Sequence, residues 1–255
     1  MAASAGERPS GRSSTRTAVV WAGLEPTLRG GPLDVLDIGG GTGGLAVRVG
    51  ELGHRVTVVD PSPDALAALG RRAREHDVEV TGRQGDLSSL LDVVGPDSAD
   101  LVLCHGVLEV VDDPADALAT LGRVLRPGGV LSLLVAQRYA AVVARAMAGH
   151  FQQALAMLDP SPDPAHRPPT GSEAPPGRVG RRYTHGELSL LVQEAGFTTD
   201  AVHGIRVFTD LVPGSLLDLE SGATTALVEL EQAVAARPEY LPLATQLHLL
   251  AHRPS

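Results

Sequence analysis

Lysine is absent from this chain of 255 residues, because all 21 of its basic residues are arginine. The absence excludes a Schiff-base lysine, the lysine of a phosphate-binding P-loop and the tyrosine–lysine pair of many short-chain dehydrogenases. The single cysteine, Cys104, excludes an internal disulfide and a cysteine metal cluster. No other set of metal-ligating residues is recognised, so no metal is expected.

Aromatic residues and long apolar runs are also scarce. Aromatics make up 3% of the chain, so the core must be built mostly from leucine, valine and alanine. No apolar run approaches the length that crosses a membrane, and no signal peptide is recognised, which predicts a cytoplasmic protein without a membrane partner. The net charge of −9 provides no general attraction to nucleic acid, and DNA is not an expected partner.

What the chain does contain is a glycine-rich turn. The apolar run from Leu33 to Ile38 predicts a buried strand, five glycines and a threonine follow within 39–44, and Leu45 to Leu52 predicts a helix. Strand, glycine turn and helix open a nucleotide-binding α/β unit. Glycine lets a ligand lie against bare backbone, and the helix N-terminus offers free N–H groups.

The turn fits the patterns of two cofactors. Gly39, Gly41 and Gly44 satisfy the dinucleotide fingerprint, whereas Asp37 followed by alternating glycines satisfies the pattern of S-adenosylmethionine (SAM) methyltransferases. Asp37 favours SAM, because an acid suits the ammonium group of SAM and would repel a pyrophosphate. Asp60 ends the next strand, where a carboxylate accepts hydrogen bonds from the ribose of either cofactor.

Later strands end in further polar residues. Gln84, Gly85 and Asp86 follow the third strand, where an acid is common at the adenine edge in SAM enzymes but is equally a helix cap. His105 follows the fourth strand, at the edge of an open parallel sheet where ligands bind, although a lone histidine is more often structural. The Leu-Arg-Pro-Gly-Gly run at 125–129 is a methyltransferase signature.

The rest of the chain predicts one domain, residues 16–255, behind a disordered tail of residues 1–15. One long helix over Arg138 to Leu158 and a mobile proline-rich loop, Asp159 to Arg182, form an expected insertion at 138–182. The remaining predictions are caps at Ser62, Asp113 and Thr184, helices over 16–28, 184–195 and 216–236, and strands within 197–208 and over 246–252.

These motifs together resemble class I SAM-dependent methyltransferases. Residues 103–114 and 124–133 look more narrowly like the tRNA 5-carboxymethoxyuridine methyltransferase family, and so do 16–21, 204–210 and 227–231. The resemblance implies a Rossmann-like α/β fold, with a mostly parallel seven-stranded sheet, an antiparallel last strand and helices on both faces.

The family methylates a carboxylate on a modified wobble uridine of tRNA to the methyl ester. A carboxylate is already ionised near pH 7, so no general base is expected. Because the arginine fork donates twice to a carboxylate, Arg206, Arg181 and Arg182 are candidate clamps for the acceptor. By position, the resemblance implies SAM contacts at Arg16, Gly39, Gly40, Asp60, Gln84, Gly85 and His105, to which the motifs add Asp37, Gly41 and Asp86.

Three alternatives stay open at this stage. The family's lysine run after the long helix is replaced here by prolines, and the charge is acidic, so the acceptor can instead be a small-molecule acid or metabolite. The glycine turn also permits an NAD(P)-dependent oxidoreductase. A non-catalytic SAM-binding regulator is the third alternative, and the sequence predicts no oligomeric state.

Overall fold

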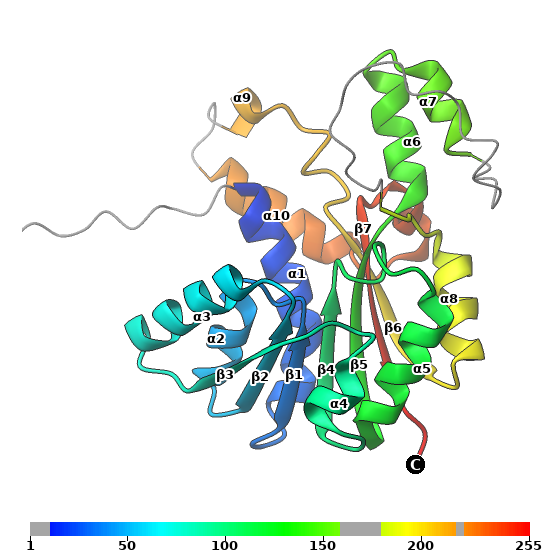
Figure 1. Ribbon diagram of the computed structural model, residues 1–255. Coiled ribbons are helices and arrows are strands. Elements are labelled where there is room, and N and C mark those ends of the chain that lie inside the picture. The colour runs from blue at the N-terminus through cyan, green and yellow to red at the C-terminus, as the bar shows by residue number, and fades with distance from the viewer. Residues whose placement is uncertain (1–10, 159–179, 218–221) are drawn as a thin grey trace, which may run out of the picture.

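The computed structural model describes residues 11–158, 180–217 and 222–255, which form a seven-stranded sheet in the order β3-β2-β1-β4-β5-β7-β6 (Figure 1). Strands β1 to β5 pair in parallel, whereas β7 is antiparallel to both β5 and β6. This arrangement confirms the predicted fold class. The strands are β1 Asp34–Ile38, β2 Arg55–Asp60, β3 Val80–Gln84, β4 Ala99–His105, β5 Leu125–Ala136, β6 Thr198–Ile205 and β7 Gln246–His252.

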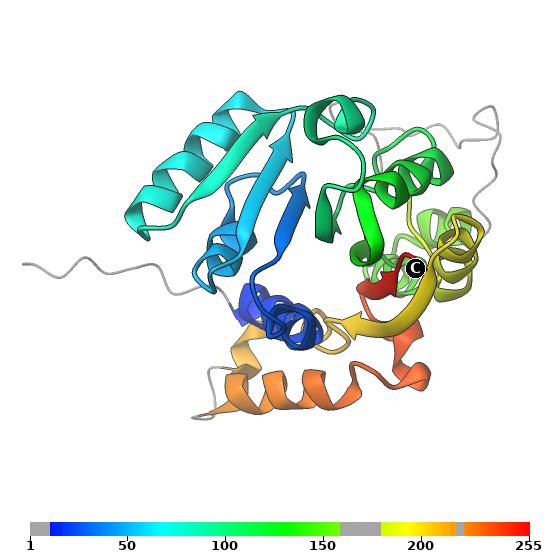
Figure 2. The same ribbon diagram turned by 90° about the horizontal axis from the view of Figure 1, so that it is seen from below.

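Helices cover both faces of the sheet (Figure 2). One face packs against α1 Gly11–Leu28, α2 Gly44–Gly50, α3 Pro63–Glu75 and the end of α10 Ala223–Val234. The opposite face packs against α4 Leu90–Val94, α5 Pro114–Val124 and α8 His185–Glu194.

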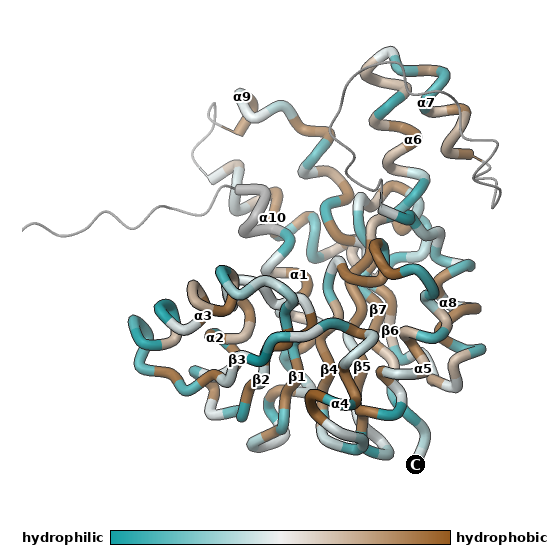
Figure 3. The backbone as a smooth tube through the Cα atoms, in the orientation of Figure 1, coloured by the Kyte–Doolittle hydropathy of each residue, from teal (hydrophilic) through white to brown (hydrophobic). Residues whose placement is uncertain are grey.

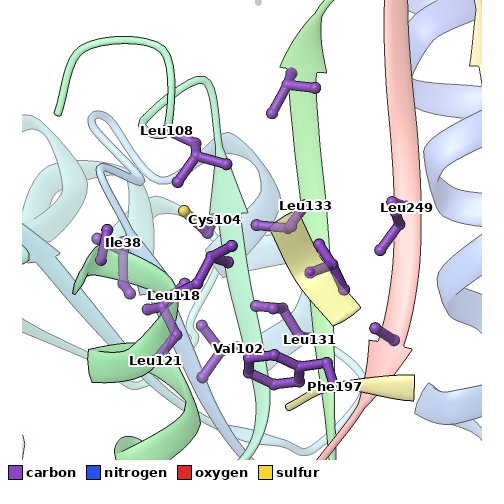
Figure 4. Packing of buried hydrophobic residues seen from close by; sticks show 14 of the residues in the cluster. Ile38, Val102, Cys104, Leu108, Leu118, Leu121, Leu131, Leu133, Phe197 and Leu249 are labelled. Carbon is purple, nitrogen blue, oxygen red and sulfur yellow. The ribbon is translucent and has the colours of Figure 1, made fainter. Parts of the chain in front are cut away.

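Strand β4 shows why both faces are apolar. Its side chains alternate between the two faces, so Leu101 and Leu103 join the core beneath α1, while Val102 and Cys104 join the core beneath α5. On the α5 side, Leu118 packs close to the buried side chains of β4 and β5 (Figure 4). Burial raises the pKa of the Cys104 thiol to about 12, so this cysteine acts as an apolar core residue.

The three predicted caps are present. Ser62 accepts a hydrogen bond from the backbone of α3, and Asp113 accepts two from the backbone of α5. Thr184 forms a reciprocal capping box with Glu187 at the start of α8. These caps fix where each helix leaves the sheet edge.

Three predicted boundaries are wrong. The first helix begins at Gly11 rather than Arg16, because α1 extends through the Gly-Arg-Ser-Ser-Thr run; residues 1–10 lie outside the described part. The expected helix over 138–158 is two helices, α6 Arg138–Met147 and α7 Phe151–Ala156, separated at Gly149, where φ is +77°.

The expected helix over 216–236 is likewise divided, into α9 Gly214–Leu217 and α10, whose N-cap Gly222 has φ +92°. A short 3₁₀ helix, Pro238–Leu243, precedes β7. The proline-rich segment 159–179 is outside the described residues, so its expected mobility stays a prediction.

Helices α6 and α7 pack together and stand above the carboxyl edge of the sheet (Figure 1). Both carry apolar segments, seen as brown stretches in Figure 3. Exposed apolar side chains on this pair include Tyr139, Met147, Phe151 and Leu155. None of the helices within the described ranges is long and apolar enough to cross a membrane.

Candidate functional site

A cavity of about 640 Å³ lies at the carboxyl ends of β1, β2 and β4. Such ends are where ligands bind in open α/β sheets. Of the predicted site residues, five line it directly, namely Gly39, Asp60, Gly85, Asp86 and His105. A larger hollow of about 840 Å³ lies at the starts of the same strands, and none of the predicted site residues lines it.

The glycine turn between β1 and α2 requires glycine for two reasons. Gly39, Gly41 and Gly43 have φ values of +65°, +55° and +76°, which side-chain-bearing residues rarely adopt. A Cβ on Gly40 would lie 2.4 Å from Asp37 Oδ2, so the turn passes directly over that carboxyl group. The turn therefore leaves bare backbone beside the cavity, as a cofactor cradle needs.

Asp60 holds this cradle through its carboxylate. Oδ2 accepts a hydrogen bond from the Gly41 N–H at 3.0 Å, and Oδ1 accepts one from the Ser62 N–H at 2.8 Å. The side chain also lines the cavity, although its residue is 7% exposed. Asp60 therefore shapes the turn as well as facing the space that a cofactor would fill.

Asp37 lies buried below the turn. Burial, together with the neighbouring Asp60, raises the pKa of its carboxyl group to about 7. A cation that approaches this carboxyl group stabilises its ionised form and is attracted to it. The glycine turn above Asp37 thus suits SAM, which carries an ammonium and a sulfonium.

Gln84 ends β3, and Gly85 and Asp86 follow it at the rim of the cavity. The Gln84 amide donates to the Pro61 carbonyl at 3.3 Å, which ties this rim to the end of β2. Asp86 Oδ1 accepts hydrogen bonds from Ser88 and Ser89, and these donors lower the pKa of the carboxyl group. Asp86 therefore both organises the turn before α4 and lines the cavity.

His105 ends β4 with its Nε2 atom 2.8 Å from the Ser132 hydroxyl. Burial and the nearby Arg16 lower the pKa of its imidazole, so the ring is neutral near pH 7. It faces the cavity on one side and the sheet interior on the other.

Arg16 and Arg182 lie close enough to the Glu109 carboxylate to lower its pKa, and Arg206 lies close to Arg16. We call these three arginines, together with Glu109, the arginine cluster. Burial and the charge of Arg206 lower the pKa of Arg16, and Glu109 raises it. Burial and the charge of Arg145 likewise lower the pKa of Arg182, and Glu109 raises it. Glu109 Oε1 accepts the Ala136 N–H at 2.8 Å, whereas its Oε2 is buried and has no hydrogen-bond partner among the described residues. Burial raises the pKa of Glu109 against the lowering effect of Arg16 and Arg182. The cluster carries more positive than negative charge, which suits an anion.

The three predicted clamps differ in position. Arg182 and Arg206 belong to this cluster, but Arg181 points its Nη1 toward the Val111 carbonyl at 3.5 Å. Arg206 is itself held by Asp210, to which its Nε donates at 2.9 Å. Arg206 also has φ +57°, a rare value for a non-glycine residue.

Sequence reasoning missed two glutamates of this region. Glu109 is the counter-charge of the arginine cluster, and buried Glu231 on α10 accepts three backbone N–H bonds and the Thr209 hydroxyl. Those donors belong to residues 207–209, immediately after Arg206. The only signal was that both glutamates lie in segments resembling the family, 103–114 and 227–231.

Comparison with known proteins agrees with this geometry. A methyltransferase domain family matches residues 36–133. The tRNA 5-carboxymethoxyuridine methyltransferase of Escherichia coli K12 is 31% identical over 251 residues, which cover 95% of this chain and 90% of that protein. A ubiquinone biosynthesis O-methyltransferase of Alkalilimnicola ehrlichii is 40% identical, but over only 37% of this chain and 38% of that protein.

Solved structures show the same fold. A SAM-dependent methyltransferase of Methanosarcina mazei has a TM-score of 0.61 at 17% identity, covering 91% of this chain and 97% of that chain. Magnesium protoporphyrin IX methyltransferase of Synechocystis PCC 6803, solved with bound SAH, has a TM-score of 0.58 at 16% identity, covering 95% and 83%.

Fold and domain match together define a class I SAM-dependent methyltransferase. At 31% identity across nearly its whole length, the chain belongs to the family of the E. coli tRNA 5-carboxymethoxyuridine methyltransferase. It is therefore an enzyme, and its cofactor is SAM rather than NAD(P).

Proposed function

We propose that this enzyme methylates a carboxylate on a modified wobble uridine of tRNA and yields the methyl ester. The observation that carries the proposal is the similarity to the E. coli enzyme over 95% of the chain, far beyond the domain match at 36–133. The arginine cluster supports it, because Arg182 and Arg206 lie outside that common domain.

For the cofactor we propose the cradle at the carboxyl edge of the sheet. The bare backbone of the glycine turn would lie against SAM, Asp60 would accept the ribose hydroxyls, and Asp37 would balance positive charge. The full proposed set is Arg16, Asp37, Gly39, Gly40, Gly41, Asp60, Gln84, Gly85, Asp86 and His105.

The transfer itself asks little acid–base chemistry of the protein. SAM supplies an activated methyl group, and the acceptor carboxylate forms the new O–CH₃ bond as the S–CH₃ bond breaks. No proton moves, which agrees with a site whose histidine is neutral and which offers no obvious general base among its described residues. The protein's contribution is to orient the two reactants and to exclude water.

For the acceptor we propose a clamp made from Arg182 and Arg206, with Arg16 adding charge. Arg182 and Arg206 are each anchored by a neighbour, at the Gln137 carbonyl and the Asp210 carboxylate. Anchoring fixes the guanidinium planes, so less entropy is lost when a carboxylate binds. Arg181 is the weakest of the three sequence candidates, since its guanidinium points to Val111.

An RNA acceptor also needs contacts beyond the reacting carboxylate. Helices α6 and α7 present Tyr139 and Phe151, which are 46% and 69% exposed, above the carboxyl edge of the sheet. Exposed rings of this kind can stack on unpaired bases. A small-molecule acid or metabolite remains the second candidate, which the net charge of −9 and the partial likeness to ubiquinone biosynthesis O-methyltransferases favour.

The deciding experiment uses purified enzyme, SAM and tRNA that carries the carboxylate precursor, followed by mass spectrometry of the nucleosides. The methyl ester at the wobble uridine is expected. Efficient transfer to the free carboxylate nucleoside with none to tRNA would instead assign a small-molecule acceptor.

A matched pair of variants tests the RNA contact. Phe151→Ala should reduce turnover of tRNA but not SAM affinity, whereas Leu190→Ala, which removes a 56% exposed side chain from α8, should change neither. Loss of SAM binding in Phe151→Ala would show that the ring has a structural role.

A further inference from the structure

A chain of hydrogen-bonded side chains runs from His105 into the sheet. His105 Nε2 lies 2.8 Å from Ser132 Oγ, and the same hydroxyl lies 2.8 Å from His248 Nε2. The His248 ring stacks on that of His203, with ring centroids 5.5 Å apart. The four side chains come from four neighbouring strands, β4, β5, β7 and β6, so this series of side chains crosses more than half of the sheet.

The packing around this chain is tight. Ser132 and His248 are fully buried, and α1 approaches the rings at Gly23, where an added Cβ would lie 3.1 Å from His248 and 3.2 Å from His203. Arg16 lies two turns earlier on α1 and acts on the charge of His105. Helix α1 thus packs against His248 and His203 at the inner end of the hydrogen-bonded series and brings the Arg16 guanidinium near His105 at its outer end.

Protons can occupy the chain in two ways. Burial lowers the pKa of His105, His203 and His248, so each ring is neutral and carries one N–H. The Ser132 hydroxyl has a single proton, so it donates to one histidine and accepts from the other. Either His248 is the donor and His105 the acceptor, or the reverse.

The inner end of the chain decides between them. Within the described part of the chain, His248 Nδ1 is buried without a hydrogen-bond partner. If Nδ1 carried the proton, a buried N–H would be left without an acceptor, which is the costlier arrangement. The proton therefore belongs on His248 Nε2, Ser132 donates to His105 Nε2, and His105 carries its own proton on Nδ1.

We propose that Ser132 and His248 are positioning residues that hold His105 as the Nδ1–H tautomer and so present a hydrogen-bond donor to the cofactor. The consequence for SAM rests on the proposed cofactor site, whereas the tautomer itself does not. No other side chain is needed to set it, because the register of β4, β5 and β7 places the three groups together.

The test is the protonation of the ring nitrogens, read from ¹⁵N–¹H spectra of the histidine side chains at pH 7.5. The chain has 9 histidines, so the His105 signals are assigned with His105→Asn. In the wild type His105 should be protonated on Nδ1 and His248 on Nε2. Ser132→Ala should turn His105 into a tautomer mixture and weaken SAM binding by roughly threefold to tenfold.

Two further variants separate positioning from packing. Ser132→Thr keeps the hydroxyl and should restore both the tautomer and the affinity. His203→Phe keeps a stacked ring outside the hydrogen-bonded chain and should leave His105 unchanged. Thermal unfolding of each variant reports any loss of fold.

A wild-type His105 protonated on Nε2, or an unchanged spectrum in Ser132→Ala, would overturn the inference. Failure of the proposed cofactor site looks different. In that case, adding SAH would not change the ¹⁵N chemical shifts of His105, while its tautomer would still depend on Ser132. The positioning role would then stand.

Discussion

The acidic side and the basic side of the proposed site come from different kinds of segment. Asp37, Asp60 and Asp86 follow one another at the ends of β1, β2 and β3. Arg16, Arg182 and Arg206, by contrast, come from α1, from the segment before α8 and from the residue after β6. The acidic side is built by local motifs, and the basic side only by the folding of distant segments.

This difference follows the charges of the two reactants. SAM is a cation, and the proposed acceptor is a carboxylate anion, so each meets the opposite charge on its own side. Methyl transfer neutralises the sulfonium of SAM and the acceptor carboxylate, which weakens the attraction at the two reacting groups, whereas the ammonium of the product SAH keeps its charge. The comparison therefore predicts that replacing the acidic residues changes cofactor binding and that replacing the basic residues changes turnover of the acceptor.

The largest expected effect concerns the support of the basic side. Glu231→Ala should lower the free energy of unfolding by roughly 3–5 kcal/mol, because it leaves the buried N–H groups of Val207 and Thr209 and the half-buried one of Phe208 without an acceptor. Urea denaturation measures the loss. Glu229→Ala, on the exposed side of the same helix, is the matched control and should change stability by only a few tenths of a kcal/mol.

A Glu231→Ala protein as stable as the wild type would show that the turn after Arg206 does not depend on this carboxylate. A variant that is destabilised yet binds SAM normally at low temperature would sharpen the comparison, since only the basic side would be affected.

The same difference explains which features of the fold and of the site could be predicted from the sequence. The glycine turn, Asp60 and the helix caps were predicted, because their geometry is set within a few residues of chain. Glu109 and Glu231 were missed, since an acid among apolar residues has no local pattern that reveals buried N–H donors far along the chain. The split at Gly149 was missed because one glycine inside a helical pattern is often tolerated.

The next largest effect is expected on the acidic side. Asp60→Ala should weaken SAM binding by roughly 1.5–3 kcal/mol, because it removes a charged acceptor of hydrogen bonds and loosens the Gly41 turn that it holds. Calorimetry with SAM measures the change. Asp64→Ala, an exposed acid one helical turn away on α3, should leave the affinity unchanged. Equal affinity of both variants for SAM would remove Asp60 from the cofactor site.

On the basic side, Arg206→Ala should lower turnover of the acceptor by roughly tenfold, with SAM affinity unchanged, since the acceptor alone loses a charged hydrogen bond. Arg206→Lys should rescue only part of the loss, because an ammonium cannot donate two parallel bonds to a carboxylate. Steady-state rates with saturating SAM provide the comparison. A parallel loss of SAM affinity in Arg206→Ala would mean that the two sides are not separable.

The smallest effect on ligand binding is a pH dependence that comes from Asp37. Its pKa is about 7 in the ligand-free protein against a model-compound value of 3.8, so the folded state keeps a proton that the unfolded chain releases. Stability without cofactor should therefore fall as pH rises from about 4 to about 7 and level off above, at a total cost on the order of 4 kcal/mol. A bound cation favours the ionised form of Asp37, so SAM binding should expel the proton. The affinity for SAM should therefore increase by roughly eightfold between pH 6 and 7.5. Calorimetry between about pH 6 and 7.5 tests it, a range that lies below the midpoint of α-amino titration. Asp37→Asn has no proton to lose there and should bind SAM with a flat profile, so the same slope in both proteins would assign the titration to another group.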